Sequence, residues 1–383
     1  MLLTVGAGVF VCASIYAIMK PTKDYSYYLD LIFKSSGISV KFGSTLHFPM
    51  INKSIAYDWG TRLLINLPYG LSSETVIKHA RTISEGLRKD IDIYYSRGLI
   101  IDVYEKDMPV SVAFPREERR DYRVPIGVNR RGEPVFYDFT GSFPHLLIGG
   151  ISGGGKSVLL RAILTSLSLG PQPYLMLNDL KGGVELGLFR DLAHVIGFAT
   201  TLQEVDVLIA KAVREMERRY GVMAAQGIQE WPGKPLIVVM DELADLKVRA
   251  KDDQAVLKNG IKAKLSTISA KGRAARVILV LATQRPSADI IDGLIKTNVA
   301  TSLCFRTRDA VQSRIVLDHD GAAALPEVPG RCIFQQARDE TIQTFYLSYE
   351  EARERLKDVP RRERDERKPE EGGALDGNSI VLG

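Results

Sequence analysis

Short apolar runs alternate with helix-like stretches between about residues 123 and 347 of the chain. Four of these runs are almost continuously apolar, as strands buried on both faces of a parallel sheet must be. They cover residues 145–148, 174–177, 236–240 and 277–281. Between two of them, residues 202–226 carry apolar side chains at helical spacing and predict one long amphipathic helix. The alternation predicts an α/β fold with a doubly wound parallel sheet.

The segment before this region has a different pattern. Residues 62–67 predict a strand, and apolar positions at helical spacing from Val76 to Leu87 predict a helix that Ser72 or Ser73 caps. The alternation of Ile91 and Ile93 and the apolar residues 99–104 predict two further strands, with a turn at 96–98 between them. Together they indicate a small α+β unit of about 80 residues. Because it holds no cluster of chemically active side chains, we expect a spacer or assembly platform.

The two ends of the chain differ from both regions. Residues 1–19 carry no charge and precede Lys20 and Lys23. At 1.5 Å per residue they just reach across a hydrocarbon core of roughly 30 Å, which predicts one membrane helix, with a buried hydrophobic helix as the alternative. The two lysines then place the following chain in the cytoplasm, anchored to the cell membrane by a single pass. No basic residue precedes the apolar run, which disfavours a secretory signal.

After Tyr349 the composition becomes mixed charge, which predicts disorder because little apolar surface is available for burial. The patterns thus divide the chain into four parts: a transmembrane helix at 1–19, a small α+β domain at 20–115, the main α/β domain at 116–349 and a disordered charged tail at 350–383.

Composition excludes several classes of protein. Of 383 residues, 45% are hydrophobic and 25% charged, which is typical of globular proteins and excludes wholesale disorder, a fibrous protein or a polytopic membrane protein. The net charge of +5 is too small to indicate nucleic-acid binding by itself. The three cysteines form no C-x-x-C pair and the five histidines have no ligand spacing, so neither a disulfide framework nor a zinc site is predicted.

One glycine-rich segment fits the pattern G-x-x-x-x-G-K-[ST]. It consists of Gly150, Ile151, Ser152, Gly153, Gly154, Gly155, Lys156 and Ser157. Glycines let several backbone N–H groups converge on a phosphate chain, and the following helix adds its positive end. In that scheme Lys156 reaches the β- and γ-phosphates of ATP and Ser157 ligates Mg²⁺. The segment follows a predicted strand and opens a predicted helix, so it indicates a P-loop NTPase of the RecA-like kind.

Polar residues follow two other apolar runs. Asp241 and Glu242 come directly after residues 236–240, at the edge of the sheet where the phosphate loop also lies. Asp241 can hold Mg²⁺ through water, and Glu242 can orient or deprotonate the attacking water. Gln284 follows the run 277–281 after two further residues and is expected at the same edge of the sheet, where it can sense the γ-phosphate. The alternative is that it only caps the end of the strand.

With these runs assembled, residues 145–325 resemble the motor domain of the FtsK/SpoIIIE family of DNA translocases. The motifs that carry the likeness are PHLLIGGISGGGKSV, NDLKGGVEL, EMERRY, VVMDELADL, SRIVLD and, most diagnostic, LATQRPSADIIDGLIKTN. The resemblance implies an ATP-dependent, hexameric motor that moves double-stranded DNA. It assigns nucleotide binding to Lys156 and Ser157, hydrolysis to Asp241 and Glu242, and γ-phosphate sensing to Gln284.

The resemblance also implies roles for basic residues. In the related conjugative coupling ATPases, an arginine in a K-G-R segment eleven residues before this glutamine acts across the subunit boundary, and Arg273 occupies that position. Arg285, Lys296 and Arg314 match three residues that grip duplex DNA in the family's pore. The fourth match, usually lysine, is Ala310, with Arg308 as its replacement. Without the resemblance to this family, the same basic residues would be interpreted as part of a solvated surface.

The layout resembles the compact translocases of Gram-positive conjugative elements, since one anchor and one small unit precede the motor and no winged helix follows. It implies transfer of a mobile element, with a relaxase nucleoprotein and a secretion channel as partners. Three alternatives stay open: a chromosome-segregation motor, a secretion ATPase that moves protein, and an adaptor without hydrolysis. Stimulation of ATPase activity by duplex DNA separates the two DNA motors from the other two.

Overall fold

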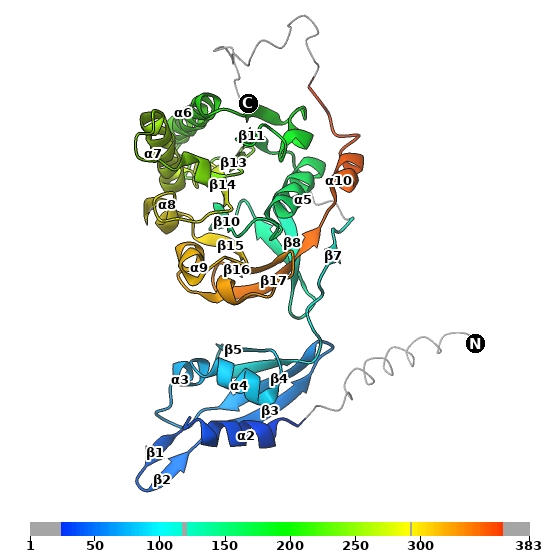
Figure 1. The fold of residues 1–383 in the computed structure, drawn as a ribbon, viewed down its shortest axis with the longest axis vertical. Helices are drawn as coiled ribbons and strands as arrows, with labels where there is room; N and C mark the ends of the chain where they lie inside the picture. Colours follow the sequence, from blue (N-terminus) through cyan, green and yellow to red (C-terminus); the bar gives the residue numbers. More distant parts are fainter. Residues whose placement is uncertain (1–23, 117–120, 292, 363–383) are drawn as a thin grey trace, which may run out of the picture. The chain divides into compact units, whose positions relative to one another are not determined.

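The computed structural model describes residues 24–116, 121–291 and 293–362 (Figure 1). The described residues fall into two compact units, one within residues 1–108 with 130–132 and the other within residues 109–129 with 133–383. The predicted membrane helix at 1–19 lies outside the described residues and stays a prediction. Within the described ranges, no helix combines the length and the apolar character that crossing a membrane requires.

The first unit is built on a four-stranded antiparallel sheet in the order β3-β4-β6-β5. Its elements are α2 (Ser26–Ser35), β1 (Val40–Phe42), β2 (Thr45–His47), β3 (Met50–Ala56), β4 (Gly60–Asn66), α3 (Ser73–Ile77), α4 (Ala80–Leu87), β5 (Ile91–Tyr95) and β6 (Leu99–Tyr104). The predicted single helix is two helices that break at His79. There the ring Nδ1 lies 2.8 Å from the Thr75 carbonyl oxygen, which a continuous helix would use for its own ladder.

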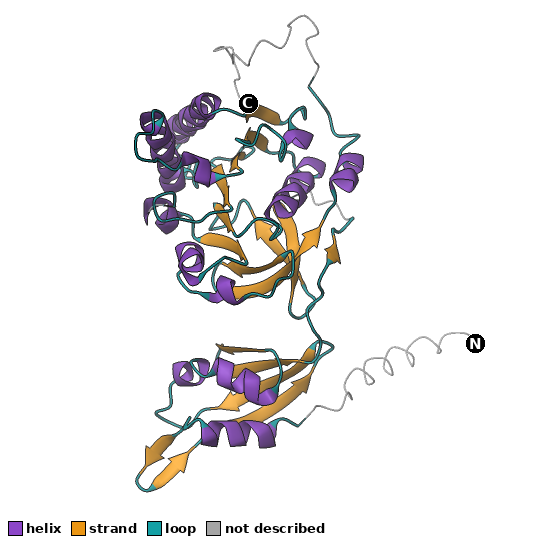
Figure 2. Ribbon diagram, in the orientation of Figure 1, coloured by secondary structure: helices purple, strands orange, loops and turns teal. Residues whose placement is uncertain are grey.

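The second unit is built on an eleven-stranded sheet with the main order β12-β11-β13-β14-β10-β15-β16-β17-β8-β9 (Figure 2). Its strands are β7 (Val112–Ala113), β8 (Arg123–Asn129), β9 (Pro134–Asp138), β10 (Leu146–Gly149), β11 (Tyr174–Asn178), β12 (Val195–Ala199), β13 (Leu236–Met240), β14 (Val277–Thr283), β15 (Thr301–Phe305), β16 (Arg331–Gln335) and β17 (Asp339–Tyr346). The strands from β12 to β15 are parallel, which confirms the predicted core of the fold.

The predicted doubly wound parallel sheet is only part of the observed one, because β16, β17, β8 and β9 extend it with antiparallel pairs. A short turn after Gln335 joins β16 to β17, and a connection that short permits only antiparallel pairing. Strand β7 adds to the edge of β17 in parallel. The sheet is therefore mixed.

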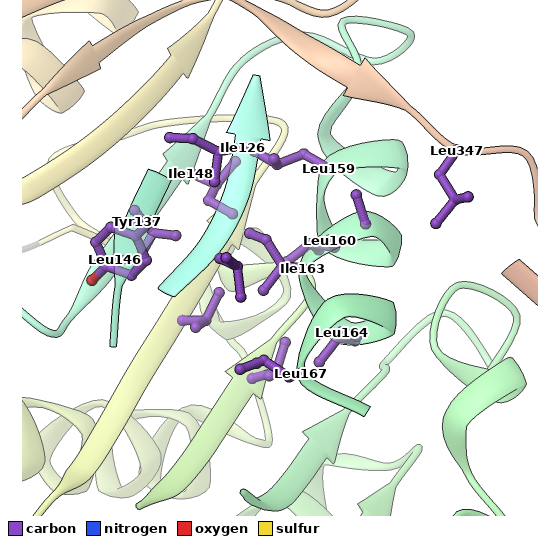
Figure 3. Close-up of a cluster of buried hydrophobic side chains, with 14 of the residues drawn as sticks. Ile126, Tyr137, Leu146, Ile148, Leu159, Leu160, Ile163, Leu164, Leu167 and Leu347 are labelled. Carbon is purple, nitrogen blue, oxygen red and sulfur yellow. The ribbon is translucent and has the colours of Figure 1, made fainter. Parts of the chain in front are cut away.

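Helices cover both faces of this sheet. They are α5 (Lys156–Leu169), α6 (Leu202–Gln226), α7 (Ala255–Lys271), α8 (Gly293–Asn298), α9 (Ala310–Leu317) and α10 (Tyr349–Arg355). One core cluster packs α5 and α10 against one face, and a second packs α6 to α9 against the other. Figure 3 shows the first cluster, in which Leu159, Leu160 and Ile163 of α5 share one core with Ile126 of β8 and Ile148 of β10. The strand before the phosphate loop and the helix after it are thus fixed together.

The prediction of disorder is wrong for the first part of the charged tail. Helix α10 begins after Ser348, whose hydroxyl accepts from the Glu351 backbone N–H at 3.0 Å. Its charged residues face outward while Ala352 and Leu356 are buried against the core, four residues apart on one side. Residues 363–383 lie outside the described part of the chain.

Candidate nucleotide-binding site

The glycine-rich loop connects β10 to α5 through a backbone that requires glycine. Gly150, Gly153 and Gly155 have φ angles of 143°, 79° and 120°. A Cβ atom on Gly150 would lie 2.6 Å from Cβ of Phe305, so the close approach also requires its absence. The Ile151 N–H donates to the Arg306 carbonyl at 3.0 Å, which holds the loop to the end of β15.

A second anchor ties this loop to the antiparallel part of the sheet. The Gly330 N–H, just before β16, donates to the Gly154 carbonyl at 2.8 Å. In turn, the Thr344 N–H of β17 donates to the Gly330 carbonyl at 2.8 Å. The loop is therefore shaped before any phosphate arrives, as an anion cradle at a helix N-terminus needs to be.

Lys156 and Asp241 form a buried ion pair. The Lys156 Nζ lies 2.9 Å from Oδ1 of Asp241 and 2.6 Å from its carbonyl oxygen. The side chains are 3% and 0% exposed, so the buried charge of Lys156 is compensated by that of Asp241. Phosphate oxygens bound in the loop would compete with Asp241 for the same ammonium group.

A second lysine lies beside Asp241, and the sequence analysis missed it. The Lys181 Nζ is 3.2 Å from Asp241 Oδ2 and 3.9 Å from Glu185 Oε1. Partial burial lowers the pKa of Lys181, but the Asp241 carboxylate outweighs it and raises the pKa above its ordinary value. The signal was available, because Lys181 follows the apolar strand β11 at the same edge of the sheet.

Glu242 and Gln284 are brought together as their places after β13 and β14 predict. The Gln284 backbone N–H donates to both carboxylate oxygens of Glu242, at 3.0 and 3.2 Å. The Ala244 N–H donates to Oε1 of Glu242 at 3.2 Å. Close by, burial and then the charge of Glu242 raise the pKa of Asp245. Glu242 is thus held as an acceptor at the sheet edge.

Among the cavities that adjoin the loop, two are also lined by Gln284. One, of about 400 Å³, is lined by loop residues and by the segments 110–111, 329–330 and 343–346. The other is open and larger, about 990 Å³, and is lined by Lys181, Glu242, Gln284, Arg285 and Arg308, among others. Ile151, Ser152 and Gln284 line both cavities, so the loop lies between them.

The four predicted DNA contacts fall into two groups. Arg285 and Arg308 are exposed and line the open cavity. The Lys296 Nζ instead lies 2.5 Å from Oδ1 of Asp318 and 2.8 Å from the Arg314 carbonyl. Arg314 itself lies 3.6 Å from Asp320. The second pair of contacts therefore already has acidic partners.

Arg273 lies at the opposite edge of the sheet from the phosphate loop of its own chain. It is exposed in the turn between α7 and β14, before the strand begins at Val277. The seven residues of β14 separate it from Gln284, a span of about 20 Å. Its guanidinium group cannot reach the loop of the same chain across that distance.

The donors present fit Mg²⁺ rather than a transition metal. Ser157 at the start of α5 and Asp241 at the end of β13 offer hard oxygen ligands. No group of three or more His, Cys, Asp or Glu side chains suited to a metal occurs within residues 24–116, 121–291 and 293–362. Mg²⁺ commonly takes one or two protein oxygens and completes its shell with phosphates and water.

A glycine cradle, a buried lysine and acids on a nearby parallel strand define a P-loop NTPase fold. Residues 113–234 match the model of the FtsK/SpoIIIE family. The likeness to the FtsK/SpoIIIE family is thus shown for residues 113–234.

Two relatives illustrate the likeness in sequence. The DNA translocase SpoIIIE of Bacillus subtilis is 29% identical over 326 residues, which cover 78% of this chain and 40% of SpoIIIE. The DNA translocase FtsK of Lactococcus lactis subsp. cremoris is 33% identical over 334 residues, covering 78% of this chain and 42% of FtsK. The chain thus spans about two fifths of these relatives.

Two solved structures extend the likeness. The pCW3 conjugation coupling protein TcpA, in a monomer form with ATPγS, is 27% identical with a TM-score of 0.61, covering 87% of this chain and 98% of TcpA. The cytoplasmic domain of the type VII secretion ATPase EccC of Thermomonospora curvata is also 27% identical, with a TM-score of 0.51, covering 63% of this chain and 31% of EccC.

Proposed function

We propose that this chain is an ATP-hydrolysing translocase of double-stranded DNA. The observation that carries the proposal is the buried Lys156–Asp241 pair beside a preformed phosphate loop, with Glu242 held next to it. The relatives named as DNA translocases favour DNA as the cargo. TcpA, named as a conjugation coupling protein, favours transfer of a mobile element over chromosome segregation because the likeness covers 98% of it.

Hydrolysis follows from the placement of these side chains. When ATP binds, the Lys156 ammonium exchanges Asp241 for β- and γ-phosphate oxygens. Glu242 accepts a proton from water, whose oxygen attacks the γ-phosphorus, and the bond to the ADP oxygen breaks. Ser157 and Asp241 would hold Mg²⁺, which would compensate the charge of the phosphates. Gln284, bonded to Glu242 through its backbone, senses the loss of the γ-phosphate.

The other assignments follow from ring assembly. In a homo-hexamer, Arg273 completes the site of a neighbouring subunit, which agrees with its distance from its own loop. Arg285, Arg308, Lys296 and Arg314 contact DNA phosphates, which position a duplex without reading its sequence. An anchor at residues 1–19 holds the motor on the cytoplasmic side of the cell membrane, next to a secretion channel and its relaxase nucleoprotein.

A protein-secretion ATPase is the second candidate, since the likeness to EccC favours it. Two measurements on the full chain separate these candidates. The first is ATPase turnover with duplex DNA, with single-stranded DNA and without DNA. The second is displacement of a triplex-forming strand from duplex DNA. The Lys156→Ala variant is the control. Duplex-stimulated turnover with triplex displacement supports the DNA motor. Turnover that ignores DNA favours secretion, and no turnover favours an adaptor.

A further inference from the structure

The sequence motif EMERRY has no role in the scheme above. It occupies residues 215–220 of helix α6. Helix α6 packs beside α7, and the turn that follows α7 carries Arg273 (Figure 1). The side chains of this motif therefore lie close enough to the turn at 271–276 to contact its backbone.

Arg219 of the motif is a fully buried cross-link between α6 and this turn. Its Nη1 donates to the carbonyl oxygens of Ala275 and Arg276, at 2.9 and 3.1 Å. Its Nε donates to Oε1 of Glu215, at 2.8 Å, so the buried charge is compensated within the motif itself. A buried guanidinium group persists only where its donors and its charge are satisfied, and here the turn satisfies part of both.

Two aromatic residues hold the rest of the turn. The Tyr220 hydroxyl, also in the motif, donates to the Lys271 carbonyl at 2.6 Å. The Trp231 backbone N–H donates to the Ala274 carbonyl at 2.8 Å. The Trp231 ring centre lies 5.0 Å from the guanidinium carbon of Arg219, within the range of a cation–π contact. The turn is thus held at its beginning, its middle and its end.

The turn also bonds to itself. The Val277 N–H donates to the Gly272 carbonyl at 2.9 Å, and the Arg276 N–H donates to the Arg273 carbonyl at 3.0 Å. Every carbonyl from Lys271 to Arg276 therefore accepts a hydrogen bond. A Cβ atom on Gly272 would lie 2.1 Å from the Val277 carbonyl oxygen, so the residue before Arg273 has to be glycine. These contacts fix the backbone that carries Arg273.

The side chain of Arg273 contrasts with its backbone. It is exposed, and no hydrogen bond or ion pair holds its guanidinium group within residues 24–116, 121–291 and 293–362. A group that stabilises a transition state has to be placed accurately, since a shift of about 1 Å can cost about 10²-fold in rate. A fixed backbone with an unengaged guanidinium group suits an arginine that acts on a site outside its own chain.

We propose that Arg219 and Tyr220 are positioning residues for Arg273, which they hold in place for the ATP site of a neighbouring subunit. The inference rests on the proposed function, in which Arg273 completes that site. It assigns the motif a part in hydrolysis that involves no contact with the nucleotide. A change at Arg219 or Tyr220 shifts Arg273 through the turn backbone and leaves the phosphate loop of its own chain intact.

The first test measures kcat and ATP affinity of the full chain with duplex DNA. Tyr220→Phe should lower kcat about two- to tenfold, the range of one neutral hydrogen bond, with ATP affinity unchanged because Arg273 acts in the transition state. Arg219→Lys keeps the charge but lacks the fork that spans two carbonyls, and should lower kcat about tenfold or more. The matched control is Tyr137→Phe, whose lost hydroxyl donates to the Phe143 carbonyl at 3.0 Å, and its kcat should equal that of the wild type.

The second test asks whether these residues act through Arg273. In an Arg273→Ala background, Tyr220→Phe and Arg219→Lys should lower kcat no further, because the group that they position is gone. Arg219→Lys subunits should recover activity when mixed with Lys156→Ala subunits, but not when mixed with Arg273→Ala subunits. A further loss in the Arg273→Ala background, or recovery with Arg273→Ala subunits, would show a different role and overturn the inference.

The remaining outcomes separate this inference from the proposed function. If Arg273→Ala is impaired but Tyr220→Phe and Arg219→Lys turn over like the wild type, the positioning role is wrong and the proposed function stands. If Arg219→Lys does not fold, Tyr220→Phe decides alone, since it removes one hydroxyl from a side chain that is only partly buried. If the wild type hydrolyses no ATP, the proposed function is wrong, and the positioning role with it.

Discussion

The backbone N–H of Gln284 reaches both carboxylate oxygens of Glu242, at 3.0 and 3.2 Å, and so joins the ends of β13 and β14. The link uses the backbone, which leaves the Gln284 side chain available on the cavities that it lines. A change in the charge of Glu242 therefore alters the strength of the hydrogen bond that the Gln284 backbone N–H donates to it. This makes Glu242 both the proposed base and part of the sensing step.

Glu242→Gln should keep ATP binding while turnover falls by about 10²- to 10⁴-fold, because the amide oxygen still accepts hydrogen bonds but cannot take the proton. The measurement compares the lifetime of bound nucleotide with turnover. Asp245→Asn, at the neighbouring acid, is the control. Joint loss of binding and turnover in Glu242→Gln would indicate a structural role instead.

Lys181→Met should weaken ATP binding by about two- to fivefold, the range of a partly exposed ion pair. Without Lys181, the charge of Asp241 is balanced by Lys156 alone, so Lys156 leaves it less readily for phosphate. Lys247→Met is the matched control, since Lys247 pairs with Asp289. Unchanged ATP affinity in Lys181→Met would mean that the second lysine does not tune the pair.

Arg273→Ala and Lys156→Ala subunits, each about 10³-fold less active alone, should recover activity when mixed. In a random equal mixture, about a quarter of the interfaces join an intact loop to an intact arginine. Turnover measured against the mixing ratio should therefore pass through a maximum. If mixed rings form and turnover stays flat, Arg273 does not act on a neighbour.

Arg285→Ala and Arg308→Ala should each lower the salt slope of duplex binding by about 0.9, on any sequence. Lys296→Ala should lower it less, because Asp318 already lies 2.5 Å from that ammonium. The measurement is duplex affinity at several salt concentrations with two unrelated sequences, and Lys41→Ala in the first unit is the control. Equal slopes in all variants would remove these residues from the DNA path.

Stability of the second unit should fall as pH drops from about 6.5 to 4. Burial lowers the pKa of His145 to about 4, and also that of His194. The unfolded chain therefore binds more protons in this window, which lowers the free energy of unfolding by up to about 1.4 kcal/mol per pH unit for each histidine. Denaturant titrations at pH 7 and 5, followed by Trp231 fluorescence in a Trp59→Phe background, measure this loss.

A matched variant assigns part of the effect to one histidine. His145 Nδ1 accepts from the Leu279 N–H at 3.0 Å, and the amide oxygen of an asparagine can accept the same bond. His145→Asn should therefore remove about half of the pH dependence. An unchanged dependence would mean that His145 does not titrate on unfolding.

The parallel core and most of the nucleotide site could be predicted because each functional residue directly follows an apolar strand. Lys156, Asp241 and Glu242 come after β10 and β13, and parallel strands end at one edge of the sheet. The same logic applies to Lys181 after β11, but a single lysine at a strand end is usually solvated. Only the 3.2 Å contact with Asp241 distinguishes it.

Other features depend on tertiary contacts that local patterns do not carry. The two-residue strand β7 is too short for any periodicity, and it exists because β17 offers it an edge. Helix α10 was obscured by its charge, although Ser348 and the spacing of Ala352 and Leu356 carry a helical signal.

The hydrogen bond from Gly330 to Gly154 also has a consequence for biosynthesis. The glycine-rich loop leaves the ribosome well before β16 and β17 exist, yet its backbone is held by Gly330 and packed on Phe305. Such distant contacts close slowly, because the intervening chain must first be ordered. A chain released early, before Gly330, has the whole motif but lacks the bond that completes the cradle. The glycine-rich loop is therefore synthesised before β16 and β17, but it reaches its final conformation only after these strands have formed.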